Sequence, residues 1–189
     1  MSYQTWQQTL AIAPTAGAAL TASTTQTSLL PSGSRYAFPA SWFQVGSMLR
    51  LTATGIMSTT TTPGTLQFFF TLGTIATPIN AFSGGAMALA ASVSNVAWFL
   101  EMLLTVRALG SGTAANLLGT GDFTSRCLLG APAVGTQQGI PTAMMPDTSP
   151  AVGTGWDSTQ VQIGDLQAAW NTNNANTITL YQYTLQSLN

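Results

Sequence analysis

Histidine and lysine are both absent from the 189 residues of this chain. Without histidine, the sequence cannot build a Ser-His-Asp triad, a Cys-His pair or a histidine-ligated metal site. Without lysine, it cannot build a phosphate-binding P-loop or a Schiff-base enzyme. These two absences exclude most of the common catalytic designs.

Charge is scarce as well, because the chain has four basic and five acidic residues, 5% of the total, where about 25% is typical. The hydrophobic share of 46% is ordinary, so we expect a folded chain and not a disordered one. A folded monomer of this size exposes roughly 8,600 Å². Nine charges over that area give little repulsion between copies, which favours a protein that lives in an assembly. Four arginines cannot form a basic stripe, so we expect no nucleic-acid binding.

Membrane spans and disulfides are not expected either. The strongest apolar stretch, residues 96 to 106, contains Glu101 and is far shorter than the about 20 residues of a membrane-spanning helix. The opening MSYQTWQQTL lacks the basic and apolar regions of a secretion signal, so we expect folding in a cytoplasm. Cys127 is the single cysteine, and its apolar surroundings indicate a buried, inert thiol.

Alternation of apolar and polar residues predicts β-strands. It is clear in residues 48–58 and 66–72, and it is strongest in residues 98–108, where every second residue from Trp98 to Ala108 is apolar. We expect that face of residues 98–108 to be core. A closing strand over residues 177–188 carries large side chains on both faces, which predicts burial on both sides.

Weaker signals complete the predicted fold. We expect a first strand near residues 18–30, two short strands around Gly119 and Gly121, a strand or helical turn over residues 161–170, and a long loop over residues 130–156. Counting gives about eight to ten strands with few helices. The sequence therefore predicts an all-β, jelly-roll-like antiparallel sandwich, with an N-terminal arm over residues 1–20 and one domain over residues 21–189.

Paired carboxylates are the remaining route to catalysis, and Asp157 and Asp165 are the best candidate pair. Both follow glycine-containing segments, which is a usual turn context, and we prefer that interpretation. No calcium-loop spacing occurs. We therefore expect a non-enzymatic protein with no metal and no cofactor. Asp122 with Arg126, and Glu101 with Arg107, are expected to form surface ion pairs.

Two aromatic pairs, Trp42 with Phe43 and Trp98 with Phe99, could stack on sugars. Aromatic residues within strands are more often core or interface, and we prefer that reading. Trp6 lies in the arm, away from any strand pattern, and is the candidate anchor inserted into a neighbour.

Two stretches of the sequence resemble structural proteins of tailed bacteriophages. They are LPSGSRY at residues 30–36 with WFQVGS at residues 42–47, and VGTGWD at residues 152–157 with Leu166, Trp170 and a closing strand over 178–188. The likeness spans most of residues 25–189. It implies a virion protein made in the host cytoplasm.

The resemblance further implies a jelly-roll-like capsid decoration or cement subunit, often a homotrimer, whose partners are its own copies and the major capsid protein or another virion protein. The alternative is a tail or head-fibre adhesin that binds a host-surface glycan. Candidate interface residues are Trp6, Arg35, Trp42 and Phe43.

Overall fold

The computed structural model describes residues 7–129, 142–146 and 148–188. Its strands are β1 (Gln8–Ile12), β2 (Leu20–Thr21), β3 (Thr27–Ser28), β4 (Tyr36–Phe38), β5 (Met48–Ser58), β6 (Thr65–Gly73), β7 (Pro78–Ala88), β8 (Val96–Ala108), β9 (Asn116–Ser125), β10 (Thr142–Met145), β11 (Gln162–Trp170) and β12 (Thr177–Ser187). A single 3-10 turn, η1 (Ser32–Ser34), precedes β4.

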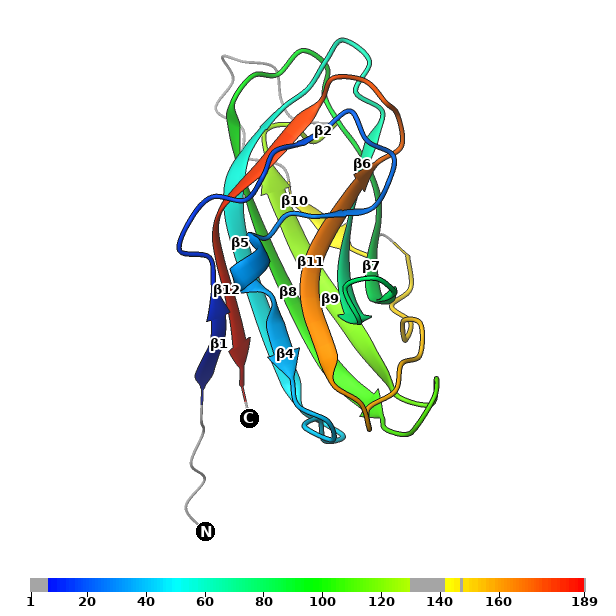
Figure 1. Ribbon diagram of the computed structural model, residues 1–189. Coiled ribbons are helices and arrows are strands. Elements are labelled where there is room, and N and C mark those ends of the chain that lie inside the picture. Colours follow the sequence, from blue (N-terminus) through cyan, green and yellow to red (C-terminus); the bar gives the residue numbers. More distant parts are fainter. Residues whose placement is uncertain (1–6, 130–141, 147, 189) are drawn as a thin grey trace.

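Two antiparallel sheets form the sandwich (Figure 1). Sheet A has the order β1-β12-β5-β8-β9-β10, with β2 also paired to β12. Sheet B has the order β3-β11-β6-β7, with β4 also paired to β11. The predicted all-β class and antiparallel sandwich are confirmed. Within the described residues, no helix has the length and apolar character needed to cross a membrane.

The core lies between the sheets, and β8 shows why its sequence folds as a strand. Its residues alternate regularly, so Trp98, Leu100, Met102, Leu104 and Val106 all point inward and are at most 2% exposed. Because side chains alternate across a strand, the polar residues between them point to solvent. The core face predicted for residues 98–108 is confirmed.

The last strand is buried on one side only, which corrects the expectation for residues 177–188. A β-bulge between Leu180 and Gln182 inserts one extra residue opposite β5. The bulge shifts the alternation, so Leu180 and Tyr183 both point into the core, while Tyr181 and Gln182 both point outward. A bulge of this kind changes the direction of side chains within a strand.

The two short strands expected around Gly119 and Gly121 are one strand, because both glycines lie inside β9. A Cβ at Gly119 would stand 2.2 Å from Phe82, and one at Gly121 would stand 2.4 Å from the Glu101 carbonyl oxygen. These glycines therefore allow close packing of neighbouring groups.

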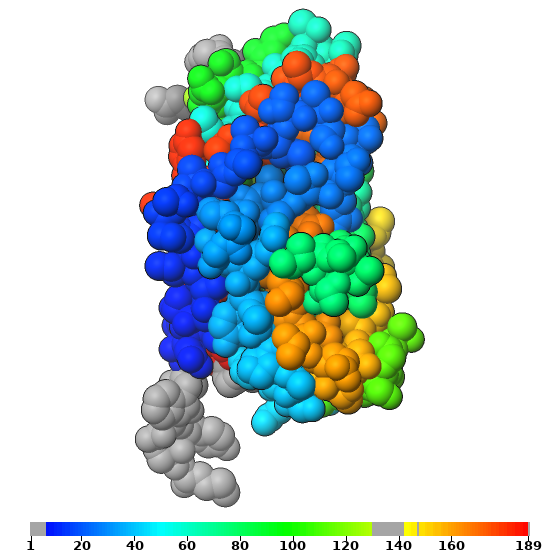
Figure 2. All heavy atoms as spheres, viewed as in Figure 1, coloured from blue at the N-terminus to red at the C-terminus, as the bar shows by residue number. Residues whose placement is uncertain are grey.

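The segment over residues 18–30 forms only the short strands β2 and β3, because Ala22 takes a left-handed conformation with φ 47°. Figure 2 shows the N-terminal part of the chain in blue, along one side and over the front of the molecule. Residues 161–170 are a strand and not a helical turn, and β10 lies within the expected loop over 130–156. Strand β7 was not predicted, since its small residues, including Gly84 and Gly85, hide the alternation.

The predicted arm over residues 1–20 contains a strand of the chain's own sheet. Strand β1 pairs with β12 from Gln8 opposite Ser187 to Ile12 opposite Thr184, and Leu10 packs against the core. Residues 1–6, with the candidate anchor Trp6, lie outside the described part of the chain.

Candidate functional site

The outward face of sheet A carries most of the charge that the structure describes. Arg50 lies on β5, Glu101 and Arg107 lie on β8, and Asp122 lies on β9, each next to at least one buried core residue of its strand. Arg126 follows β9 and lines a pocket on the same face. Five of the eight charged residues in the described part of the chain are therefore on this surface, which we call the charged face.

One ion pair crosses the charged face. The Arg50 Nε lies 2.8 Å from Glu101 Oε1, and the two side chains are 42% and 36% exposed. An ion pair with this much exposure adds little stability. The sequence predicted that Glu101 would pair with Arg107, but Glu101 instead pairs across strands with Arg50. Asp122 stands directly opposite Glu101 in the β8–β9 register.

The opposite surface of the molecule is nearly free of charge. We call it the uncharged side: the outward face of sheet B with its edge strands β4 and β7. At its β7 edge, a groove of about 220 Å³ between β7 and β10 is lined by apolar residues and one threonine. Among them, Leu129 is 64% exposed, and Met144 is 71% exposed and stands opposite Asp122 of the charged face. The charged residues Arg35 and Asp165 on this side neutralise each other.

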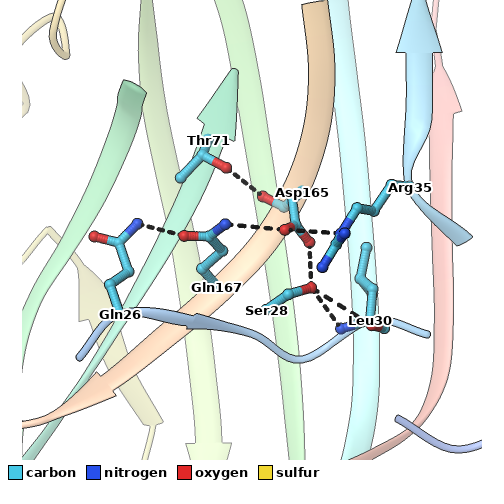
Figure 3. A network of polar contacts seen from close by, with 7 residues as sticks. All are labelled: Gln26, Ser28, Leu30, Arg35, Thr71, Asp165 and Gln167. Atoms are coloured by element: carbon cyan, nitrogen blue, oxygen red, sulfur yellow. Dashed lines mark hydrogen bonds and ion pairs between the residues drawn. The ribbon is translucent and has the colours of Figure 1, made fainter. Parts of the chain in front are cut away.

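Arg35 and Asp165 form a buried polar network that holds the N-terminal segment to sheet B (Figure 3). Arg35 Nε lies 3.1 Å from Asp165 Oδ2, and the two side chains are 21% and 6% exposed. Ser28 Oγ donates a hydrogen bond of 2.6 Å to Asp165 Oδ1, and Gln167 Nε2 donates one of 2.9 Å to Asp165 Oδ2. Gln26 Nε2 donates to Gln167 Oε1 at 2.7 Å.

The prediction that Asp165 lies in a turn is therefore wrong. Asp165 lies in the middle of β11, opposite Thr71 of β6, and is 4% exposed. Its partners Ser28 and Arg35 are more than 120 residues away in the sequence, which is why local context misled the prediction. This carboxylate joins two segments of the fold.

Asp157 does lie in a turn, as expected. Its Oδ1 accepts hydrogen bonds from the Thr159 hydroxyl at 2.6 Å and from the Thr159 backbone N–H at 2.9 Å. These hydrogen bonds, the hydroxyl's first, hold the pKa of Asp157 below its ordinary value. Asp157 and Asp165 have separate sets of hydrogen-bond partners. Among the described residues, no group of three or more histidine, cysteine or acidic side chains could hold a metal ion.

A pocket of about 490 Å³ lies on the charged face, beside the bulge of β12. Two of its lining side chains are large, aromatic and open to solvent: Tyr181, 48% exposed, and Phe99, 40% exposed. Between them lies β5, which contributes Thr54 and Ile56, while Arg126 supplies the pocket's charge. The sequence named Phe99 as a possible sugar-stacking residue, but it did not single out Tyr181, because the strand pairing that places Tyr181 and Phe99 on either side of β5 is long-range.

The other predicted aromatic and interface residues are mostly enclosed. Trp98 is 2% exposed and packs against Phe68 and Phe123, so it belongs to the core. Phe43 is 3% exposed and packs against Trp156, with ring centroids 4.6 Å apart. A side chain enclosed in its own chain has little surface left for a partner.

Trp42 and Arg35, two further candidate interface residues, are only partly buried. Trp42 packs edge-on against Phe43 with ring centroids 5.1 Å apart. Arg35 lines a second pocket, of about 520 Å³, between β1 and the segment around η1. The use of Arg35, Trp42, Phe43 and Trp6 in an interface stays a prediction.

Burial keeps two titratable side chains in their protonated, unreactive form. Burial raises the pKa of the Cys127 thiol, so the thiolate form is suppressed, which agrees with the inert thiol predicted for this residue. Burial also raises the pKa of Tyr183 far above its ordinary value, and the charge of Asp165 adds to this effect. The Tyr183 hydroxyl has no hydrogen-bond partner among the described residues.

The fold and these surfaces define an antiparallel β-sandwich with one charged face and one uncharged side. No family model and no curated protein matches the chain. Among solved structures, the CBM2 module of the evolved Dit of Lactobacillus casei BL23 phage J-1 is similar at 12% identity and a TM-score of 0.29, over 82% of this chain and 69% of that chain. A likeness at this TM-score carries no argument about function.

Proposed function

We propose that this chain is a structural subunit of a bacteriophage virion, which assembles through its uncharged side with its own copies and with other virion proteins. The observation that carries the proposal is the segregation of charge: five charged residues lie on one face of the sandwich. Protein interfaces are depleted of lysine, glutamate and aspartate, because each charge that enters an interface loses its hydration.

Exposed apolar side chains also support placing the interface on the uncharged side. Leu129 is 64% exposed and lines the groove at the β7 edge of this side, where Ala86 and Ala88 of β7 are exposed as well. Such side chains gain free energy when a partner covers them, at about 25 cal/mol for each Å² of apolar surface removed from water. The sequence resemblance to phage structural proteins supports the virion setting, with capsid decoration as a homotrimer as the particular role.

A charge-insertion series tests the proposal. Ala37 on β4 and Ala86 on β7 are exposed on the uncharged side, and Ala97 on β8 is exposed on the charged face. Ala37→Glu or Ala86→Glu should weaken self-association or attachment to the particle, because a glutamate would have to be desolvated there. The matched control Ala97→Glu should leave both unchanged.

Multi-angle light scattering and co-sedimentation with virions lacking this protein are the measurements. A stable monomer at micromolar concentration that also fails to bind such particles would overturn the proposal. Equal effects of the three substitutions would show that the uncharged side is not the interface. Deletion of residues 1–6 in the same assays tests the Trp6 anchor separately.

Glycan binding is a second candidate function, in which the subunit serves as an adhesin of the virion. One observation favours it: Tyr181 and Phe99 are exposed aromatic side chains in one pocket on the charged face. This function does not compete with assembly, since it uses the opposite surface.

A further inference from the structure

We infer that the pocket between Tyr181 and Phe99 binds a saccharide and that Arg126 makes it select an acidic sugar. The inference deepens the second candidate function and uses none of the residues assigned to assembly. It rests on the placement of two aromatic rings, on the β-bulge beside one of them, and on the single charge of the pocket.

The first step is the spacing of the rings. Tyr181 lies on β12 and Phe99 lies on β8, with β5 between them in the sheet. Neighbouring strands are about 4.8 Å apart, so the two side chains rise from backbones about 10 Å apart. Thr54 of β5 stands opposite Phe99 on one side and opposite Gln182, the neighbour of Tyr181, on the other. The two rings are therefore nearly in line across the sheet, at a separation that matches every second ring of an oligosaccharide.

The second step is the bulge. Without it, the alternation of β12 would send Gln182 into the core and Tyr183 out to solvent, yet both Tyr181 and Gln182 point outward. Bulges are concentrated where a strand must direct a side chain toward a functional site. An aromatic ring held 48% exposed on a rigid sheet is preorganised for stacking, since little side-chain freedom remains to be lost.

The third step is the chemistry of the lining. A pyranose ring presents C–H groups on its faces, which pack on aromatic rings, and hydroxyl groups around its edge, which need hydrogen-bond partners. The pocket offers both: its apolar floor contains Ile56, while the hydroxyl groups of Thr54 and Thr124 lie at its walls. Each hydroxyl group has one partner in the chain, Gln182 Oε1 at 3.5 Å from Thr54 Oγ1 and Thr142 Oγ1 at 2.9 Å from Thr124 Oγ1, and a hydroxyl oxygen can still accept a further hydrogen bond from a sugar.

The fourth step is the charge. Arg126 is the charged residue among the pocket's lining side chains, and it is exposed. Its guanidinium group matches the planar geometry of a carboxylate and can bind it through two parallel hydrogen bonds. The pocket therefore favours a sugar that carries a negative charge over the same sugar without it.

Binding of a tetramer of galacturonate and of its methyl ester tests the inference, because the two probes share every ring and differ in charge. Isothermal titration calorimetry of the full chain should show saturable binding of the acid and at least about tenfold weaker binding of the ester. Tyr181→Ala and Phe99→Ala should each weaken binding of the acid by about tenfold, whereas Tyr181→Phe should retain it. Arg126→Gln should abolish the difference between the acid and its ester.

Matched controls lie on the same face outside the pocket. Leu103→Ala removes an exposed apolar side chain of β8, and Arg107→Gln removes an exposed arginine of the same strand. Both should bind the acid as the parent does. A glycerol phosphate oligomer, which has the charge but no sugar ring, should bind at least tenfold more weakly than the galacturonate tetramer.

Several results would overturn the inference. They are no saturable binding of the galacturonate tetramer at millimolar concentration, unchanged affinity in Tyr181→Ala and Phe99→Ala, equal affinity for the acid and its ester, or equal affinity for glycerol phosphate. Light scattering on the same samples reports self-association independently. A failure here therefore leaves the proposed assembly role intact.

Discussion

Replacing Asp165 should destabilise the protein strongly, although its sequence context suggested a tolerant turn position. The Asp165→Asn variant keeps the size of the side chain but removes its charge. The Arg35 guanidinium 3.1 Å away would then lack its counter-ion, and an amide NH₂ would replace one of the two oxygens that accept hydrogen bonds from Ser28 and Gln167. Because Asp165 is 4% exposed, water cannot readily compensate.

The expected magnitude follows from these contacts. Removing one partner of a buried ion pair costs about 3 to 5 kcal/mol. Arg35 is 21% exposed and keeps part of its hydration, so we expect the lower end, about 3 kcal/mol in the free energy of unfolding. In a chain of this length, that loss lowers the melting temperature by about 6 to 12 °C.

Urea unfolding followed by tryptophan fluorescence and circular dichroism measures the effect. The double variant with Arg35→Gln should lose less than the sum of the two single variants, because the second substitution removes the uncompensated charge. A loss below about 0.5 kcal/mol in Asp165→Asn, typical of surface positions, would refute the reasoning that the network holds the N-terminal segment to sheet B.

Three further predictions follow from burial. Leu104→Ala should lower the free energy of unfolding by about 2 to 5 kcal/mol in urea titrations, because Leu104 is 1% exposed in the core, and an unchanged midpoint would contradict this. Tyr183→Phe should not destabilise the protein at pH 7, because it removes a buried hydroxyl without a partner. Below the ordinary tyrosine pKa of 10.0, Tyr183 is protonated in both the folded and the unfolded state, and the parent keeps its full stability. Above that pH, Tyr183 ionises in the unfolded state but not in the folded state, so the free energy of unfolding should fall by about 1.4 kcal/mol per pH unit. Tyr183→Phe should reduce that slope. Asp157→Asn should lower the melting temperature much less than Asp165→Asn does, since the hydrogen bonds of Asp157 lie at the exposed surface, and an equal loss would contradict the assignment.

The sequence predicted those parts of the fold whose signal is local. Residues 98–108 alternate without interruption, and the structure confirms their core face. The closing strand also alternates, but its register depends on a bulge opposite β5, and nothing in residues 177–188 alone marks it. The sequence did not predict strand β7 for a related reason: Gly84 and other small residues of this strand pack closely but carry no hydrophobic pattern.

The surfaces could be predicted only in part. The sequence placed Glu101 and Arg107 on one face of a strand, and both do lie on the charged face. The sequence could not predict that Arg50 and Asp122 lie on the same face, because the strand order β5-β8-β9 arises from long-range pairing. The Tyr181 pocket was missed for the same reason, since its lining comes from four strands distributed along the chain.

The two proposals agree on how the subunit is oriented in its assembly. Glu101 and Asp122 face each other directly, and like charges in register destabilise a sheet unless water and a counter-ion such as Arg50 screen them. A neighbouring subunit that covered this face would remove the water and strengthen the repulsion, because desolvation lowers the local dielectric constant. Under the proposed assembly, the charged face therefore stays in solvent, and a pocket on that face stays open to ligands. The Arg35–Asp165 pair, in contrast, is already neutralised within the chain, so covering the uncharged side leaves no unpaired charge there.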